Sequence, residues 1–173
     1  MLADAAIELF LEQSYEATSV TEITRRAGVS RSSFFNYFTG KSEILWFVLD
    51  LRLAVVSEAL ADPGVDVLTA LGMFAADDSP ETLALAIVDS RTMGVEQELA
   101  TGRAERQLRL GAAIAERHVR DGADSVSAEI IGAGYAAALL SAVWRWADLG
   151  AGRHPLTDTV AESLAAARGL FER

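Results

Sequence analysis

Side chains that can donate hydrogen bonds to nucleic acid are concentrated in residues 28–38, which read GVSRSSFFNYF. The wider window 23–42 contains no acidic residue, although the whole chain has a formal net charge of −10. The basic residues of this window are Arg25, Arg26, Arg31 and Lys41. Guanidinium, hydroxyl and amide groups bind base edges and phosphates. A basic window inside an acidic chain therefore predicts that nucleic acid binds at one confined surface.

Residues suited to catalysis are sparse. The chain has no cysteine, and its two histidines, His118 and His154, lie far apart in the sequence. No HExxH, GxSxG or phosphate-loop glycine pattern occurs. Glu96 and Glu98 lie two residues apart, so they do not share a helix face. The sequence therefore predicts a protein that is not an enzyme and that uses no cofactor and no metal ion.

Helical periodicity recurs along the whole chain and predicts an all-α protein. Ser19 or Thr18 can cap a helix near residue 20, and Glu22 fits a capping box with Ser19. Gly28 is a natural end for that helix, and Ser30 can cap a third, short one. The other helices are expected over 3–13, 42–60, 66–76, 81–99, 103–120, 125–149 and 156–171.

Two short helices joined by Ala-Gly-Val-Ser are typical of the helix-turn-helix, whose tight turn commonly contains glycine. The second helix of this motif places its N-terminal side chains in the DNA major groove. Phe34 and Phe38 lie four residues apart, so they are expected to fill the core beneath that helix. The side chains left to face the groove and its walls are Arg31, Ser32, Ser33, Phe35, Asn36 and Tyr37.

Residues 5–45 contain, without a gap, Leu9-Phe10, Tyr15, Thr18, Val20, Ile23, Ala27-Gly28-Val29-Ser30, Phe34, Tyr37-Phe38, Lys41 and Leu45. In these residues the stretch resembles the DNA-binding domain of the TetR family of transcriptional regulators. The resemblance implies a homodimeric, all-helical regulator, most often a repressor, whose N-terminal helices bind DNA and whose C-terminal domain binds a small ligand.

By position, the resemblance also implies roles for individual residues. Thr18, Ser19 and Thr21 would lie at the DNA backbone or the groove edge. Arg31, Ser32, Ser33 and Asn36 would face bases, and Tyr37 and Lys41 would hold phosphates. Many members have tyrosine where this chain has Phe35, whose ring could instead touch a thymine methyl group. Members usually carry a basic segment before the first helix, so here either some non-specific affinity is lost or the start is truncated.

We expect a helix-turn-helix DNA-binding domain over 1–45 and a helical ligand-binding and dimerisation domain over 46–173. The longest uncharged apolar run, 130–144, has 15 residues, fewer than a membrane span needs. We therefore expect a cytoplasmic protein without a membrane partner. The last two helices resemble those that pair with their copies in the family, although the same residues could line the core of one protomer. Candidate interface residues are Ala136, Leu140, Val143, Leu164 and Leu170.

A ligand cavity is expected among the helices near 66–120, bounded by the helix over 125–149. Its candidate lining residues, each of which could instead belong to the core or the surface, are Met73, Phe74, Arg91, Met93, His118, Tyr135 and Trp144. The run RAERQLR, 103–109, has charge partners three and four residues apart and is expected to be a solvated helix face.

Two hypotheses follow. The favoured one is a ligand-responsive transcriptional repressor that binds a palindromic DNA operator as a homodimer and an unidentified small-molecule effector. The alternative is a small-molecule-binding or helical interaction protein with weak or lost DNA binding, which Phe35, the short start and the net charge of −10 motivate.

Overall fold

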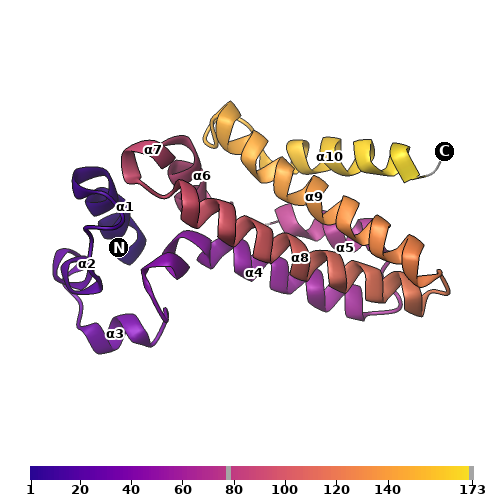
Figure 1. The fold of residues 1–173 in the computed structure, drawn as a ribbon, viewed down its shortest axis with the longest axis horizontal. Coiled ribbons are helices and arrows are strands. Elements are labelled where there is room, and N and C mark those ends of the chain that lie inside the picture. Colours follow the sequence, from indigo (N-terminus) through magenta and orange to yellow (C-terminus); the bar gives the residue numbers. More distant parts are fainter. Residues whose placement is uncertain (77–78, 172–173) are drawn as a thin grey trace.

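The computed structural model describes residues 1–76 and 79–171, and this part of the chain contains helices and no strand (Figure 1). Three short helices form a unit at one end, and α4 leads from it into a longer bundle. The prediction of an all-α fold with these two parts is confirmed. The elements are α1 (Leu2–Gln13), α2 (Val20–Ala27), α3 (Arg31–Phe35), α4 (Lys41–Ala61), α5 (Val67–Gly72), the 3₁₀ turn η1 (Met73–Ala75), α6 (Glu81–Val88), α7 (Ser90–Met93), α8 (Glu96–Arg120), α9 (Ser125–Leu149) and α10 (Leu156–Phe171).

Side-chain caps fix the ends of the N-terminal helices. The Glu22 amide donates to the Ser19 hydroxyl at 3.2 Å, and the Ser19 amide donates to the Glu22 carboxylate at 2.8 Å. Gly28 ends α2 with φ of 69°, a left-handed conformation that glycine adopts without steric cost. The Ser30 hydroxyl accepts from the Ser33 amide at 3.0 Å and so starts α3. The predicted capping box, glycine stop and third-helix cap are confirmed.

Aromatic and aliphatic side chains hold the three N-terminal helices together. Phe10 of α1, Ile23 of α2 and Phe34 of α3 are fully buried. The Phe34 ring lies 5.3 Å from the Phe38 ring, and Phe38 is also buried. Burying a side chain of this size stabilises a fold by about 1.5–3 kcal/mol. The two phenylalanines therefore brace the third helix from beneath, as the sequence predicts.

The C-terminal bundle is built on three long helices, with α9 lying between α8 and α10 (Figure 1). α8 and α9 approach closely where Gly132 faces Gly111. A Cβ atom at Gly132 would lie 2.4 Å from the Gly111 carbonyl oxygen. On the α10 side, a Cβ atom at Gly134 would lie 2.2 Å from the Phe171 ring. The glycines of α9 thus serve packing within the protomer.

The predicted break between the helices over 81–99 and 103–120 is wrong. The chain breaks instead at Gly94, which has φ of 67° and ends α7, and α8 then runs without interruption from Glu96. Gly102, which falls in the gap between the two expected helices, lies inside α8 against Trp46. A Cβ atom there would lie 2.4 Å from the Trp46 ring. Close helix packing therefore explains the glycine.

The helix α4 connects the two parts of the molecule and runs through the predicted domain boundary at residue 45. Its first residues contact the N-terminal unit, and its remaining length packs against α8, α5 and α6. The domain division at this residue stays a prediction. Because α4 is one continuous helix, a change in its packing on α8 can be carried to the N-terminal helices.

Candidate nucleic-acid interface

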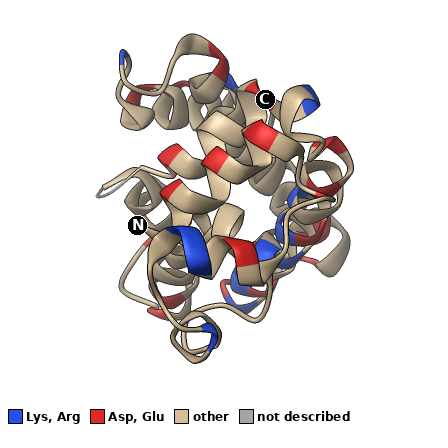
Figure 2. Ribbon diagram, turned by 90° about the vertical axis from the view of Figure 1, so that its left-hand side faces the viewer, with Lys and Arg blue, Asp and Glu red and all other residues tan. Residues whose placement is uncertain are grey.

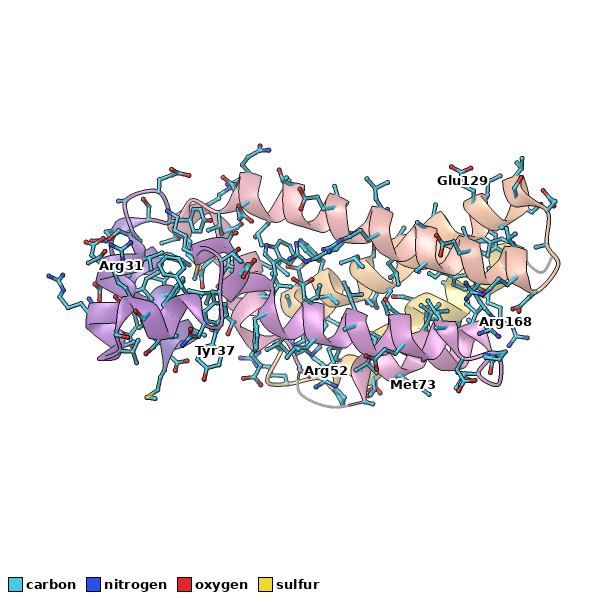
Figure 3. The ribbon with its side chains drawn as sticks, turned by 90° about the horizontal axis from the view of Figure 1, so that it is seen from below. Arg31, Tyr37, Arg52, Met73, Glu129 and Arg168 are labelled. Carbon is cyan, nitrogen blue, oxygen red and sulfur yellow. The ribbon has the colours of Figure 1, made fainter. Side chains whose placement is uncertain are left out.

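The helix-turn-helix lies at one tip of the elongated molecule. Arg31 and Tyr37, on and just after α3, both lie at this end in Figure 3. The side chains of Arg31, Ser32 and Asn36 are exposed. Tyr37 is 68% exposed, although Phe34 and Phe38, which precede and follow it in the chain, are both buried. The structure therefore brings four of the predicted contact residues together on one accessible surface.

Phe35 belongs to the same exposed surface. Its side chain is 49% exposed, and its ring meets the buried Phe34 ring edge-on at 5.2 Å. The Arg31 guanidinium carbon lies 5.9 Å from the Phe35 ring centre, within the range of a cation–π contact. Phe35 therefore supports the arginine that opens the helix and still presents an apolar edge.

The other predicted hydroxyl contacts, Ser19, Thr21 and Ser33, differ in exposure and in the hydrogen bonds that they already form. Thr21 is exposed near the start of α2. The Ser19 hydroxyl donates to the Glu22 carboxylate at 2.8 Å and also accepts the helix cap. Ser33 is half-buried, and its hydroxyl lies 2.9 Å from that of Ser30. Ser19 and Ser33 can therefore reach DNA only while they also serve as parts of helix caps.

Thr18 cannot present its side chain to DNA, which corrects the prediction for this residue. It is 2% exposed, and its hydroxyl donates to the Ser14 carbonyl oxygen at 2.8 Å. The threonine fixes the turn between α1 and α2 from the inside. Residue type and position suggested a groove-edge contact, whereas the fold turns this side chain inward.

Lys41 forms hydrogen bonds within the protein that the sequence does not reveal. Its Nζ donates to the carbonyl oxygens of Tyr15 and Thr18, at 2.6 and 3.0 Å. The same atom lies 4.2 Å from the Tyr15 ring centre. Two of the three ammonium donors are thus used to tie α4 to the loop between α1 and α2. The structure gives Lys41 a positioning role, and the phosphate contact of this residue stays a prediction.

Fewer residues at this tip carry an unpaired positive charge than the basic window 23–42 suggests. Arg26 forms ion pairs with Glu12 at 2.7 Å and Glu8 at 3.1 Å. Its hydrogen bonds to these carboxylates raise the pKa of Arg26, and the same contact lowers the pKa of Glu12. Figure 2 looks at the molecule from this end and shows acidic positions around the basic ones. Within the described residues, Arg25 and Arg31 are the exposed cations of the window that have no ion pair.

Tyr15 connects the N-terminal unit to the bundle, and the sequence analysis missed this contact. Its amide donates to the Met93 carbonyl oxygen at 2.7 Å, so the end of α7 docks on the loop between α1 and α2. Burial and the negative charge of Glu98 raise the pKa of Tyr15 to about 12. Glu98 also accepts a hydrogen bond from the Trp46 indole at 3.3 Å. No local sequence pattern could have shown this, because the three partners come from separate elements.

The predicted ligand residues are not gathered in one cavity. Phe74 and Met93 are fully buried core residues, and Tyr135 is buried against the Phe171 ring. Arg91 is exposed and pairs with Glu96 at 3.5 Å. The others are also dispersed. Met73 lies in η1 on the periphery of the bundle (Figure 3), His118 is half-buried on α8, and Trp144 borders a surface cavity.

Four of the five predicted dimer residues lie inside the protomer. Ala136, Leu140 and Val143 are fully buried, and Leu164 is nearly so. They fill the contacts of α9 with its neighbours, so the prediction that they form the dimer interface is wrong. Leu170 differs, since it is 70% exposed. Helical spacing identified the apolar helices, but it did not separate their inner faces from their outer ones.

The solvated face predicted over 103–109 is also wrong in part. Arg106 is buried, donates to both carboxylate oxygens of Asp50, and covers the Trp46 ring at 4.1 Å. Arg103 is half-buried over the Trp144 ring. Arginine can be buried when its planar group stacks on an indole, which charge spacing within one helix does not reveal.

Fold and site together define an all-helical protein with a helix-turn-helix at its tip, and comparison with known proteins agrees. Residues 2–45 match the model of the bacterial regulatory proteins, tetR family. The transcriptional regulator YwcC of Bacillus subtilis is 35% identical over 49 residues, which are 28% of this chain and 22% of YwcC. The regulator SrpR of Pseudomonas putida is 39% identical over 51 residues, 30% of this chain and 24% of SrpR. The matched segment thus spans about a quarter of these relatives.

Solved structures share the whole fold. A TetR-family regulator from Syntrophomonas wolfei aligns over 99% of this chain and 93% of its own, with a TM-score of 0.60 and 18% identity. A transcriptional regulator from Rhodococcus sp. Rha1 aligns over 96% and 93%, with a TM-score of 0.55 and 23% identity. Residues 2–45 are therefore similar to the DNA-binding domain of the tetR family of bacterial regulatory proteins, and the chain as a whole shares the fold of solved transcriptional regulators.

Proposed function

We propose that the protein is a cytoplasmic, homodimeric, ligand-responsive repressor that binds a palindromic DNA operator. The observation that carries the proposal is the exposed N-terminal end of α3, braced from beneath by Phe34 and Phe38. A helix held in this way can enter the major groove with its first residues leading. Arg31, Ser32 and Asn36 supply hydrogen-bonding groups for base edges, and Phe35 supplies an apolar edge for a thymine methyl group.

Phosphate contacts would come from a small set of groups. Arg25 and Arg31 are exposed cations, Tyr37 offers an exposed hydroxyl, and Thr21 lies near the start of α2. Backbone amides at a helix start can also bind phosphate. Because few cations contribute, about two phosphate charges are neutralised per protomer, which gives a salt slope of roughly −4 for a dimer.

An apolar outer face of α9 supports dimerisation. Val126, Ile130 and Ala133 are exposed and, with Ala137, follow the spacing of one helix face. α9 is long and apolar enough to cross a membrane, with a mean hydropathy of 1.6 over the most apolar window, yet only 44% of that window is buried in the protomer. A groove of about 740 Å³ continues this face onto α8, where Leu108 is 75% exposed. A second copy would cover the surface and supply the second DNA-reading head that a palindrome requires.

Sedimentation analysis tests the dimer. Replacing Ile130 with Glu places a charge in the proposed contact and should convert the dimer to a monomer. Leu51→Glu is a matched control, because Leu51 is an exposed leucine of α4. A monomeric wild-type protein, or equal effects of the two substitutions, would contradict the proposed surface.

DNA binding is tested by fluorescence anisotropy with the DNA that lies upstream of the gene. The proposal predicts saturable binding of two protomers to an inverted repeat, which weakens as salt is raised. Binding that does not distinguish the repeat from random DNA would instead support a helical interaction protein with lost operator recognition.

A further inference from the structure

Arg103 on α8 is a half-buried cation that lacks a carboxylate partner. The two buried arginines of the same helix have one each: Arg106 pairs with Asp50 and Arg117 with Asp121. Arg103 instead donates from Nη2 to the Ser141 hydroxyl at 2.9 Å. Within the described part of the chain it forms no ion pair, and burial lowers its pKa. A charge withdrawn from water without a counterion favours the binding of an anion.

An aromatic surface lies directly beside this charge. The Arg103 guanidinium carbon is 4.5 Å from the Trp144 ring centre, and Trp144 lies 6.3 Å from Trp46. Arg103 and Trp144 border a cavity of about 500 Å³, whose apolar walls include Ile87 and Leu99. Pockets of about 300–1,000 Å³ suit small organic ligands. The cavity therefore offers one cation and apolar side chains to the same occupant.

Two carboxylates limit the charge of that occupant. Asp148 and Glu96 also border the cavity. Glu96 pairs with Arg91 at 3.5 Å, whereas Asp148 is exposed and unpaired among the described residues. A ligand with several negative charges would meet Asp148 unfavourably, while a single carboxylate can pair with Arg103 and keep its apolar part on Trp144.

We propose that this cavity binds a small aromatic monocarboxylate, with Arg103 holding the carboxylate and the apolar lining of Ile87, Leu99 and Trp144 contacting the ring. This inference rests on the proposed function, because it names the class of effector to which the regulator responds. An arginine fork matches a carboxylate geometrically, and charge-assisted hydrogen bonds of this kind are stronger than neutral ones.

The cavity is placed so that a ligand can act on the DNA-binding tip. Ser90 of α7 borders the cavity, and the Met93 carbonyl at the end of α7 holds the Tyr15 amide. On the other side, Trp46 of α4 bonds to Glu98. Ligand contacts with Ser90 of α7 and with Trp144, whose ring lies beside that of Trp46, thus change the packing that orients the helix-turn-helix. A ligand shifts this equilibrium by its differential affinity for the two arrangements.

Calorimetric titration of the full chain without DNA tests the site, so its outcome is independent of operator binding. The probes are 2-naphthoate, its neutral amide 2-naphthamide and the cation 2-naphthylmethylammonium. We expect 2-naphthoate to bind about tenfold or more tightly than the amide, since hydrogen bonds between charged groups are stronger than those between neutral groups. Equal binding of acid and amide, or preference for the cation, would overturn the proposal.

Three variants test which charged side chains determine the preference for 2-naphthoate. Arg103→Gln should abolish the preference for the acid, whereas Arg153→Gln, which removes an exposed charge outside the cavity, should leave it unchanged. Asp148→Asn should tighten 2-naphthoate binding because it removes a repelling charge. Thermal melting shows whether each variant is folded. The proposal is wrong if the folded Arg103→Gln variant still prefers 2-naphthoate to the amide. It is also wrong if Asp148→Asn lowers the affinity for 2-naphthoate.

Discussion

Arg31 is the first residue of α3 and the exposed cation nearest the predicted base contacts. Replacing it with Ala should relax specificity at one base pair of each half-site and cost about 1–3 kcal/mol of binding to the preferred sequence. Binding to a set of operators that differ at single positions measures this. Arg153→Ala is the control for loss of one exposed charge. An equal loss on all sequences would show that Arg31 contacts phosphate only.

Lys41 illustrates how a side chain can support DNA binding without touching DNA. Replacing it with Met removes its bonds to the Tyr15 and Thr18 carbonyls, which should lower the free energy of unfolding by about 1–3 kcal/mol. Affinity for all DNA sequences should fall in parallel, because the tip is less well positioned. Thermal melting and anisotropy measure the two effects. A normal melting curve with weakened DNA binding would show a direct phosphate contact instead.

Residue types predicted which stretch forms the candidate interface, but the fold decided which side chains face outward. Arg31, Ser32, Asn36 and Tyr37 are exposed as expected. Thr18 points inward, and Arg26 is neutralised by Glu8 and Glu12 of α1. Helical spacing within α2 and α3 cannot reveal such partners, because Ser14 lies in the preceding loop and the two glutamates lie in α1.

At the scale of elements, Gly102 allows α8 to approach α4. Replacing it with Ala should force the new Cβ atom against the Trp46 ring and destabilise the protein by about 1–3 kcal/mol, as overpacked cores do. Gly72→Ala is a matched control within α5, because its Cβ atom would meet no other atom. Chemical denaturation measures both. If Gly102→Ala is as stable as the parent, the close packing of α8 on α4 is incorrect.

Hydrogen bonds at the starts of two helices make the stability of the protein depend on pH. Hydrogen bonds from Ser19 lower the pKa of Glu22, and hydrogen bonds from Thr39 lower the pKa of Glu43. A carboxylate whose folded pKa is depressed contributes stability above its unfolded pKa and loses it as pH falls through the folded value. Stability should therefore decline below about pH 4.5, near the ordinary glutamate pKa.

Ser19→Ala provides the control for this pH dependence. It removes one partner of Glu22 and should cost about 1 kcal/mol at neutral pH. Melting curves recorded from neutral pH into the acid range should then show a smaller loss on acidification than in the parent. An unchanged acid dependence would mean that Glu22 does not stabilise α2.

The helices were largely predictable because caps and glycine stops are local signals. Ser19, Gly28 and Ser30 each act on residues close to them in the chain. Gly94 and Gly102 cannot be told apart in this way, because both are glycines within helical periodicity. One has a left-handed backbone and the other packs on a distant tryptophan. Only the three-dimensional contacts distinguish these two uses.

At the scale of the whole molecule, α4 and α7 connect the DNA-binding tip to the bundle, and α6 also contacts α1. α4 is tied to α8 by the Arg106–Asp50 pair, and α7 is tied to the tip through Met93 and Tyr15. The sequence predicted the two parts, but not these connections, the outer face of α9 or the cavity beside Arg103. Each of these depends on which faces of several helices meet.

The central claim is that two copies of α3 read the two halves of an inverted repeat. Anisotropy titration of the wild-type protein against an intact repeat and against the same DNA with one half-site scrambled tests it most directly. Our account predicts two protomers on the intact repeat and an affinity lower by at least about tenfold on the scrambled one, since each lost base contact costs about 1–3 kcal/mol. Equal affinity for the two DNAs would contradict it.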